Sequence, residues 1–441
     1  MVTAPSYYDR GIEEYDRLLS SVPYGLPIPR NITEIFLFVA PFMMFLRMNG
    51  LGTLFATDFL LLLVFPFVLV TGIRHLRKRQ IWLPLLLCFF WLLSQIVTDV
   101  IVHSSPDDFI RGWSKIFLTL AYLATFWILI GSSMRRFVFY GLGWSTGAIL
   151  GTIVAPSEQE VDTPWKFGSA IPTTLLVLIL ASLLARGRHR WIFPASMICM
   201  AMINLFSSAR SLGLICVLVG AYSYFLMRLN ASGRRLGGMK KSVVWAMVLA
   251  AALGFYGFYK YSAQSGLLGR KDQEKYQQQS GQGNVVLGGR HEILASLQAV
   301  RDSPIIGHGS WARDETYYQL MVQKVIESGG RMGGGKKGDK LQEHLIPEHS
   351  FVMGAWVEAG LAGAVFWFYV LFQIIRALRR ATGGEPFLPV FAFMGILSLW
   401  NIPFSPYSAE QRFASTYFFI AMLMLSNMTE ALRARRLAGS R

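Results

Sequence analysis

Repeated apolar runs, most of them nearly long enough to cross a lipid bilayer, limit most strongly what this chain can fold into. An α-helix needs about 20 apolar residues to span the hydrocarbon core. Backbone polar groups inside a bilayer must bond to one another, so a chain with many such runs forms a helical bundle. We expect about 12 membrane-spanning helices, at residues 32–47, 53–72, 81–102, 116–131, 137–154, 167–185, 192–206, 212–228, 242–261, 350–375, 387–402 and 413–428.

The composition agrees with this class and excludes an ordinary soluble fold. Of the 441 residues, 53% are hydrophobic and 15% are charged, whereas about 25% of the residues in soluble domains are charged. The net charge of +16 could suggest a nucleic-acid partner, but the Lys and Arg residues separate the apolar runs instead of forming one face or tail. We therefore expect membrane lipids, and no nucleic acid, around this chain.

Basic residues are concentrated in alternate connections between the apolar runs. Six of these segments, the C-terminal tail included, hold 21 Lys and Arg residues against only Glu385 and Glu430. Such a bias places these segments and both termini in the cytoplasm. The predicted organisation is a cytoplasmic N-terminal segment, helices one to nine, a large outer loop, helices ten to twelve and a basic cytoplasmic tail, at residues 1–31, 32–261, 262–349, 350–428 and 429–441.

The outer loop between helices nine and ten spans 88 residues and is the longest predicted connection. Its stretches 276–283 and 329–338, rich in Gln, Gly or Lys, have the composition of linkers. Between them, residues 290–301 show the spacing of an amphipathic helix, with one apolar face made by Ile293, Leu294, Leu297 and Val300. We expect this helix to lie against the membrane surface or the bundle.

Functional residues are expected on the outer side, because the cytoplasmic connections are short and basic. Arg210 is either an interface residue that reaches toward water or a fixed cation that faces an outer cavity. Arg290 opens the loop helix and is either a solvated charge or a second functional cation. Lys166, which follows Trp165, has the position of an interfacial anchor, and His308 lies in a glycine-flanked turn where a structural role is favoured.

His349 stands just ahead of the tenth predicted helix, in Pro347-Glu348-His349-Ser350. An imidazole at this outer position can take a proton from a hydroxyl group near neutral pH, but a histidine at a helix start can also be a cap or a packing residue. Glu358 follows about half a turn away around the helix, at about 100° per residue, so we do not expect it to face His349. Gly360 and Gly363 are predicted to let helices approach closely.

Two kinds of chemistry find no support in the sequence. No Gly-rich loop ending in GK[ST] is present, which argues against nucleotide hydrolysis. No outer cluster of carboxylates or histidines has the spacing of metal ligands. We expect neither a metal ion nor a cofactor.

With these motifs and this topology, the chain resembles the O-antigen ligase and O-antigen polymerase superfamily of bacterial membrane glycosyltransferases. The resemblance covers nearly the whole chain, including the large loop between helices nine and ten. Arg210-Ser-Leu-Gly-Leu214 and Arg290-His-Glu-Ile-Leu294 are similar to the family's Arg-x-x-x-Leu pattern, and His349 followed by Gly360-x-x-Gly363 resembles its histidine motif. The resemblance implies a multi-pass protein of the bacterial inner membrane with a periplasmic loop and active site.

The resemblance also implies a reaction. The donor would be a glycan on undecaprenyl diphosphate, and the acceptor would be lipid A–core for a ligase or a lipid-linked glycan repeat for a polymerase; the motifs do not separate the two. Arg210 and Arg290 would hold the diphosphate, and His349 would take the proton of the acceptor hydroxyl, without a metal.

A transporter or flippase of lipid-linked oligosaccharide is the alternative function. Transporters of this size usually contain two halves related by a repeat, with broken helices that meet at the midplane. We find no such repeat in the sequence. The candidate residues on and around a large outer loop therefore favour chemistry at the outer face.

Overall fold

The structure is a computed structural model that describes residues 21, 23, 27–50, 52–184, 191–231, 238–269, 273, 276, 292–327 and 344–438. Its main helices are α2 (Ile32–Phe42), α3 (Ala56–Leu76), α4 (Arg79–Val102), α5 (Pro106–Ile130), α6 (Met134–Val154), α7 (Glu158–Asp162), α8 (Ala170–Leu184), α9 (Ile192–Phe206), α10 (Arg210–Ala231), α11 (Gly238–Gln264), α13 (Glu292–Asp302), α14 (Glu315–Glu327), α15 (Phe351–Ala359), α16 (Leu361–Arg380), α17 (Leu388–Phe404) and α18 (Ala409–Ala438). A 3-10 turn η1 (Met43–Phe45), a π-helical turn η2 (Trp165–Ser169) and an antiparallel hairpin of β1 (Arg47–Asn49) and β2 (Thr53–Phe55) complete the fold.

Eight helices in the described part of the chain are long and apolar enough to cross a membrane. They are α3, α4, α5, α6, α8 together with η2, α10, α11 from Ser242 onward, and α16. Three further apolar segments are shorter: Ile32–Phe45, α9 and α17. The predicted all-α membrane protein is therefore confirmed at this level, whereas the count of 12 spans stays a prediction.

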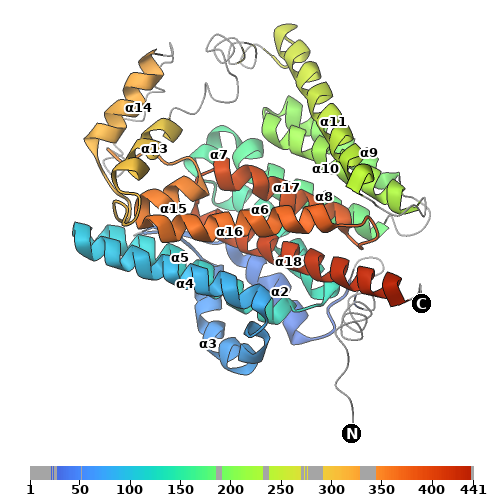
Figure 1. The fold of residues 1–441 in the computed structure, drawn as a ribbon, viewed down its shortest axis with the longest axis horizontal. Helices are drawn as coiled ribbons and strands as arrows, with labels where there is room; N and C mark the ends of the chain where they lie inside the picture. Colours follow the sequence, from blue (N-terminus) through green and yellow to red (C-terminus); the bar gives the residue numbers. More distant parts are fainter. Residues whose placement is uncertain are drawn as a thin grey trace.

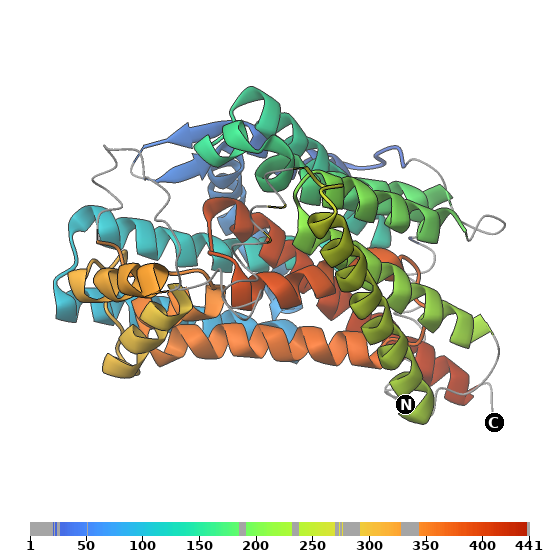
Figure 2. The same ribbon diagram turned by 90° about the horizontal axis from the view of Figure 1, so that it is seen from above.

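The long helices lie side by side in one bundle, and α13, α14 and α15 gather at one end of it (Figures 1 and 2). α18 finishes at the opposite end (Figure 1). We call the end that holds α13, α14 and α15 the loop end. The turn between α4 and α5 also belongs to it, because Arg313, just before α14, donates to both carboxylate oxygens of Asp108 at 2.6 and 3.2 Å.

Glycines on α6 set how closely the first apolar helix packs. A Cβ atom on Gly143 would lie 2.1 Å from the carbonyl oxygen of Phe38, and one on Gly147 would lie 2.2 Å from that of Phe42. Residues four apart share one face of a helix, so the two glycines form a strip against which the α2 backbone rests. Such small-residue contacts are typical of helix pairs inside membranes.

The prediction of one continuous tenth helix at 350–375 is wrong. It is broken at Gly360, whose φ of +65° favours glycine, into α15 and α16. A Cβ atom there would lie 1.9 Å from the carbonyl oxygen of Ile305, so the loop after α13 passes directly over the break. The expected close approach at Gly363 is confirmed, because a Cβ atom on it would lie 2.3 Å from the carbonyl oxygen of Ala355.

The loop that crosses this break also closes the C-terminal end of α15. The last carbonyl groups of a helix have no partner within the helix. Here the Val357 and Glu358 carbonyls accept from the backbone N–H groups of His308 at 2.7 Å and Gly309 at 3.0 Å, and Ser94 Oγ donates to the Ala359 carbonyl at 2.8 Å. α15 is thus a short helix held at the loop end by backbone contacts.

The loop helix predicted at 290–301 is confirmed from Glu292 onward as α13, and residues 290 and 291 lie outside the described residues. Its predicted apolar face is wrong in part. The buried residues are Ala295, Ser296, Ala299 and Val300. Leu294 and Leu297 are 48% and 38% exposed. Small side chains let α13 pack closely against α14 and α15, and this close packing turns both leucines outward.

Candidate functional site

His349 lies at the loop end, one residue ahead of Ser350, which caps α15 by accepting from the Met353 N–H at 3.2 Å. The His349 side chain is exposed. Among the described residues it makes no hydrogen bond or ion pair. Capping therefore belongs to Ser350, and the imidazole is open to solvent.

Arg210 is the first residue of α10 and is partly buried. Its Nη1 donates to the hydroxyl oxygen of Tyr259 on α11 at 2.5 Å, and its guanidinium carbon lies 5.1 Å from the centre of the same ring. A cation over an aromatic face gains about 0.5–2 kcal/mol. Arg210 is thus oriented by α11. Arg290 lies outside the described residues.

The two secondary candidates occupy different surroundings. Lys166 lies in η2 on an exposed surface, with its Nζ 4.7 Å from the Phe167 ring centre, and its role as an interfacial anchor stays a prediction. His308 makes a bond of 2.8 Å between its Nε2 and the Ala299 carbonyl oxygen, and its ring packs edge-on against Tyr317. These contacts place His308 in the structural framework under α13 and α14.

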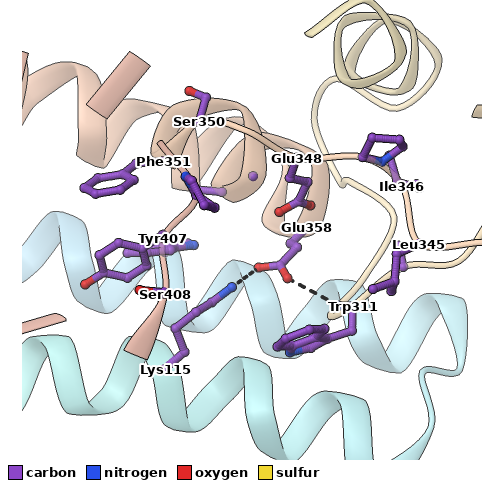
Figure 3. Close-up of a pocket in the computed structure, with 16 residues that line it drawn as sticks. Lys115, Trp311, Leu345, Ile346, Glu348, Ser350, Phe351, Glu358, Tyr407 and Ser408 are labelled. Carbon is purple, nitrogen blue, oxygen red and sulfur yellow. Dashed lines mark hydrogen bonds and ion pairs between the residues drawn. The ribbon is translucent and has the colours of Figure 1, made fainter. Parts of the chain in front are cut away.

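A pocket of about 350 Å³ opens at the loop end (Figure 3). Glu348 and Ser350 line it, whereas His349 between them is not one of the lining residues. It is formed by α4, α5, α15, the segment before α14, the segment before α15 and the turn before α18. It is lined by Trp91, Lys115, Trp311, Ala312, Leu345, Ile346, Pro347, Glu348, Ser350, Phe351, Gly354, Ala355, Glu358, Pro406, Tyr407 and Ser408. The chain on both sides of His349 therefore belongs to the pocket wall.

An ion pair forms the floor of the pocket. Lys115 Nζ on α5 donates to Glu358 Oε2 on α15, and their side chains are only 17% and 4% exposed. The other carboxylate oxygen of Glu358 accepts from the Trp311 backbone N–H at 3.3 Å (Figure 3). Burying a charge is tolerated when it is paired and hydrogen-bonded, and both conditions hold for Glu358.

Asp99 on α4 fixes the loop that carries Trp311. Its Oδ1 accepts from the Ser310 N–H at 2.6 Å, and its Oδ2 accepts from the Ser310 hydroxyl at 2.7 Å and from Trp113 Nε1 at 2.7 Å. A Cβ atom on Gly112 would lie 2.0 Å from Ser310 Oγ, so only a glycine leaves room for this contact. The loop is thereby tied to α4 and α5 at once.

Glu348 places a second carboxyl group opposite the first. Its side chain points toward Glu358 across the pocket (Figure 3), and its Oε2 covers Gly354, on which a Cβ atom would lie only 2.5 Å away. Among the described residues its carboxyl has no hydrogen-bond partner. Burial, and then the negative charge of Glu358, raise the pKa of Glu348 to about 8, against the opposing effect of Lys115. This carboxyl is therefore more readily protonated than an exposed glutamate.

Aromatic side chains make the remaining wall. The rings of Phe351 and Tyr407 lie 4.9 Å apart, centre to centre, and those of Trp91 and Tyr407 lie 6.2 Å apart. The Tyr407 hydroxyl lies 2.7 Å from that of Thr119, and burial raises the pKa of Tyr407 to about 12. Tyr407 is therefore neutral at any physiological pH.

Sequence reasoning did not assign Lys115, Trp311 or Glu348 to a site. Lys115 fell just outside the predicted helix 116–131, whereas α5 begins at Pro106 and carries it well inside a helix. Glu358 is buried and His349 is exposed, but helical rotation is not the reason, because His349 precedes the Ser350 cap and lies outside α15. The useful signal was Glu348 itself, a carboxyl group in the segment just ahead of α15, where the direction of a side chain is not fixed by helical periodicity.

No family model matches this chain, and no curated protein matches it either.

Proposed function

We propose that the chain is a membrane glycosyltransferase of cell-surface polysaccharide biosynthesis. In this proposal it has 12 membrane spans, both termini in the cytoplasm of a bacterial inner membrane, and a periplasmic loop end. It transfers a glycan from undecaprenyl diphosphate to an acceptor hydroxyl, as an O-antigen ligase or a repeat-unit polymerase. The observation that carries the proposal is the pocket at the loop end, whose wall is built from the residues on either side of His349.

The reaction needs few groups. The acceptor oxygen forms a bond to the anomeric carbon, the bond from that carbon to the diphosphate oxygen breaks, and its electron pair leaves with the diphosphate. His349 takes the proton of the acceptor hydroxyl and later gives it to water. Arg210 and Arg290 hold the diphosphate through charge-assisted hydrogen bonds while its negative charge grows. The exposed imidazole of His349 and the oriented guanidinium of Arg210 suit these roles.

A reconstituted reaction tests the proposal. The purified chain in proteoliposomes is given lipid-linked repeat units, with lipid A–core or further repeats as acceptors. We expect a longer glycan with one of the two acceptors, and the acceptor used separates ligase from polymerase. His349→Ala should lose this product, whereas His103→Asn, which alters an exposed histidine on the turn between α4 and α5, should retain it. No product with either acceptor from folded wild-type protein would refute the proposal.

The orientation can be tested separately. Single cysteines introduced near positions 280 and 335 should react with a membrane-impermeant thiol reagent added from the periplasmic side. A cysteine near position 235 should not react. Labelling at 235 from outside would reverse the orientation and place the pocket in the cytoplasm.

Proton-coupled transport is the second candidate, and the observation that favours it is the cluster of Glu348, Glu358 and Lys115. Ionisable groups buried in membrane proteins often mark ion or proton pathways. A carboxyl that gains and loses a proton near neutral pH could couple proton movement to a substrate. The two candidates differ in whether the bond between glycan and diphosphate is broken.

A further inference from the structure

The charges of the pocket argue against binding of the diphosphate group of the proposed substrate. Two carboxyl groups, those of Glu348 and Glu358, face the pocket, and its one cation, Lys115, is already paired with Glu358. The pocket is therefore neutral when Glu348 is protonated and negative when it is ionised. A diphosphate carries several negative charges, and in either form of Glu348 the pocket wall offers no cation to pair with them, because Lys115 is already paired with Glu358. The pocket is thus suited to an uncharged ligand with hydroxyl groups.

The polar groups match a ligand that donates hydrogen bonds. The Glu348 carboxyl has no partner among the described residues, and the Glu358 oxygens have lone pairs beyond those used by Lys115 and Trp311. Hydrogen bonds from hydroxyl groups to the ionised Glu358 carboxylate are among the stronger ones in proteins, and a protonated Glu348 can both accept a hydrogen bond from a hydroxyl and donate one to it. A cavity of about 350 Å³ lies at the small end of the range found for ligand sites.

Trp311 offers a flat apolar face next to these carboxyl groups (Figure 3). Its side chain is 38% exposed, and its φ of +52° is a backbone conformation that bulky residues seldom adopt. Strain of this kind costs about 1–3 kcal/mol and is concentrated at functional sites. The guanidinium of Arg111 lies 5.7 Å from the Trp311 ring centre and helps to fix the ring.

We infer that this pocket binds a neutral sugar ring of the acceptor glycan. The carboxyl groups of Glu348 and Glu358 accept hydrogen bonds from its hydroxyls, and Trp311 lies against the face of the ring. We assign the ring to the acceptor because two residues of the pocket wall, Glu348 and Ser350, flank His349 in the chain, and His349 is the group proposed to take the acceptor's proton. The inference rests on the proposed function for this assignment, but sugar binding itself can be measured without turnover.

Protection from a carbodiimide measures this binding directly. Dicyclohexylcarbodiimide modifies protonated carboxyl groups in apolar surroundings, so Glu348 of the full chain in nanodiscs should be labelled at neutral pH, as detected by mass spectrometry. A panel of methyl glycosides of common neutral hexoses, 6-deoxyhexoses and N-acetylhexosamines is then added. At least one should slow labelling by the factor 1 + [L]/Kd, about threefold at twice its Kd. Mannitol, which has the hydroxyls but no ring, should protect far less, and pyrophosphate should not protect.

Variants show whether the protection comes from the pocket. Glu348→Gln should abolish the label, while Glu158→Gln, at an exposed carboxyl on α7, should leave it unchanged. Trp311→Ala should remove the protection and Trp311→Phe should keep part of it, whereas Trp82→Ala, at a 54% exposed tryptophan on α4, should keep all of it.

The inference is overturned if no glycoside protects more than mannitol, if pyrophosphate protects, or if Trp311→Ala leaves protection intact. Because no step of this assay needs a donor, its outcome is independent of transfer. Active transfer without protection would refute the sugar pocket alone. Protection without transfer would refute the proposed reaction and keep the sugar site.

Discussion

The proton on Glu348 should respond to its two charged neighbours in opposite directions. Burial and the negative charge of Glu358 raise the pKa of this carboxyl well above its usual range. Glu358→Gln removes the negative charge that raises this pKa and leaves the Lys115 ammonium unpaired beside Glu348. An opposite charge within a few ångströms lowers a carboxyl pKa by about 1–3. The midpoint of the Glu348 titration should therefore fall by about 1–3, and fewer molecules should be protonated at neutral pH.

Lys115→Met is the matched perturbation of opposite sign. It removes the cation that lowers the pKa of Glu348, so the midpoint should rise. Infrared difference spectra between acidic and alkaline pH report the protonated carboxyl of Glu348, assigned by its loss in Glu348→Gln. A midpoint that stays fixed in both variants, or moves in the same direction in both, would refute the coupling between Glu348 and the ion pair.

Three further variants test the site and the fold. His349→Gln should lower transfer as severely as His349→Ala, by about 10²–10⁴-fold, because neither side chain can accept a proton; near-normal turnover in a folded Gln variant would remove the general base. Arg210→Lys should lose most of the transfer activity at normal membrane abundance, since an ammonium cannot make bidentate phosphate contacts, and full activity would leave Arg210 as an anchor. Gly360→Ala should lower the thermal unfolding temperature, because the strained backbone conformation costs about 1–3 kcal/mol and the added methyl group meets the Ile305 carbonyl. Gly254→Ala, where a Cβ atom meets nothing within 4 Å, should leave the unfolding temperature unchanged. Equal unfolding temperatures of the two variants would contradict the described break.

The sequence was sufficient to predict the class of fold because the signal is long and repeated. An apolar run of about 20 residues that crosses a bilayer must form a helix. Accordingly, α3, α4, α6 and α10 follow the predicted ranges within a few residues. The break at Gly360 could not be predicted in this way. It depends on the backbone of Ile305, more than fifty residues earlier, which lies across the helix only in the folded chain.

The candidate site was predictable only where residues are neighbours in the sequence. The place of His349 just ahead of a helix follows from the local sequence, whereas the pairing of Lys115 with Glu358 joins α5 to α15 across 243 residues. The outer position of His349 stays a prediction. The face of α13 was mispredicted because large apolar residues were expected to be buried. In the structure the small residues Ala295 and Ala299 pack, since they allow the helices to approach closely.

The fate of the donor tests the central claim most directly. A lipid-linked repeat unit labelled separately on its glycan and on its lipid is supplied to the reconstituted chain together with the acceptor. We expect the two labels to part, with the glycan on the acceptor and the lipid recovered as its diphosphate, and we expect His349→Gln to prevent this separation. If instead both labels stay together and cross to the other leaflet of the bilayer, the chain moves its substrate without cleaving it, and the account of a glycosyltransferase is wrong.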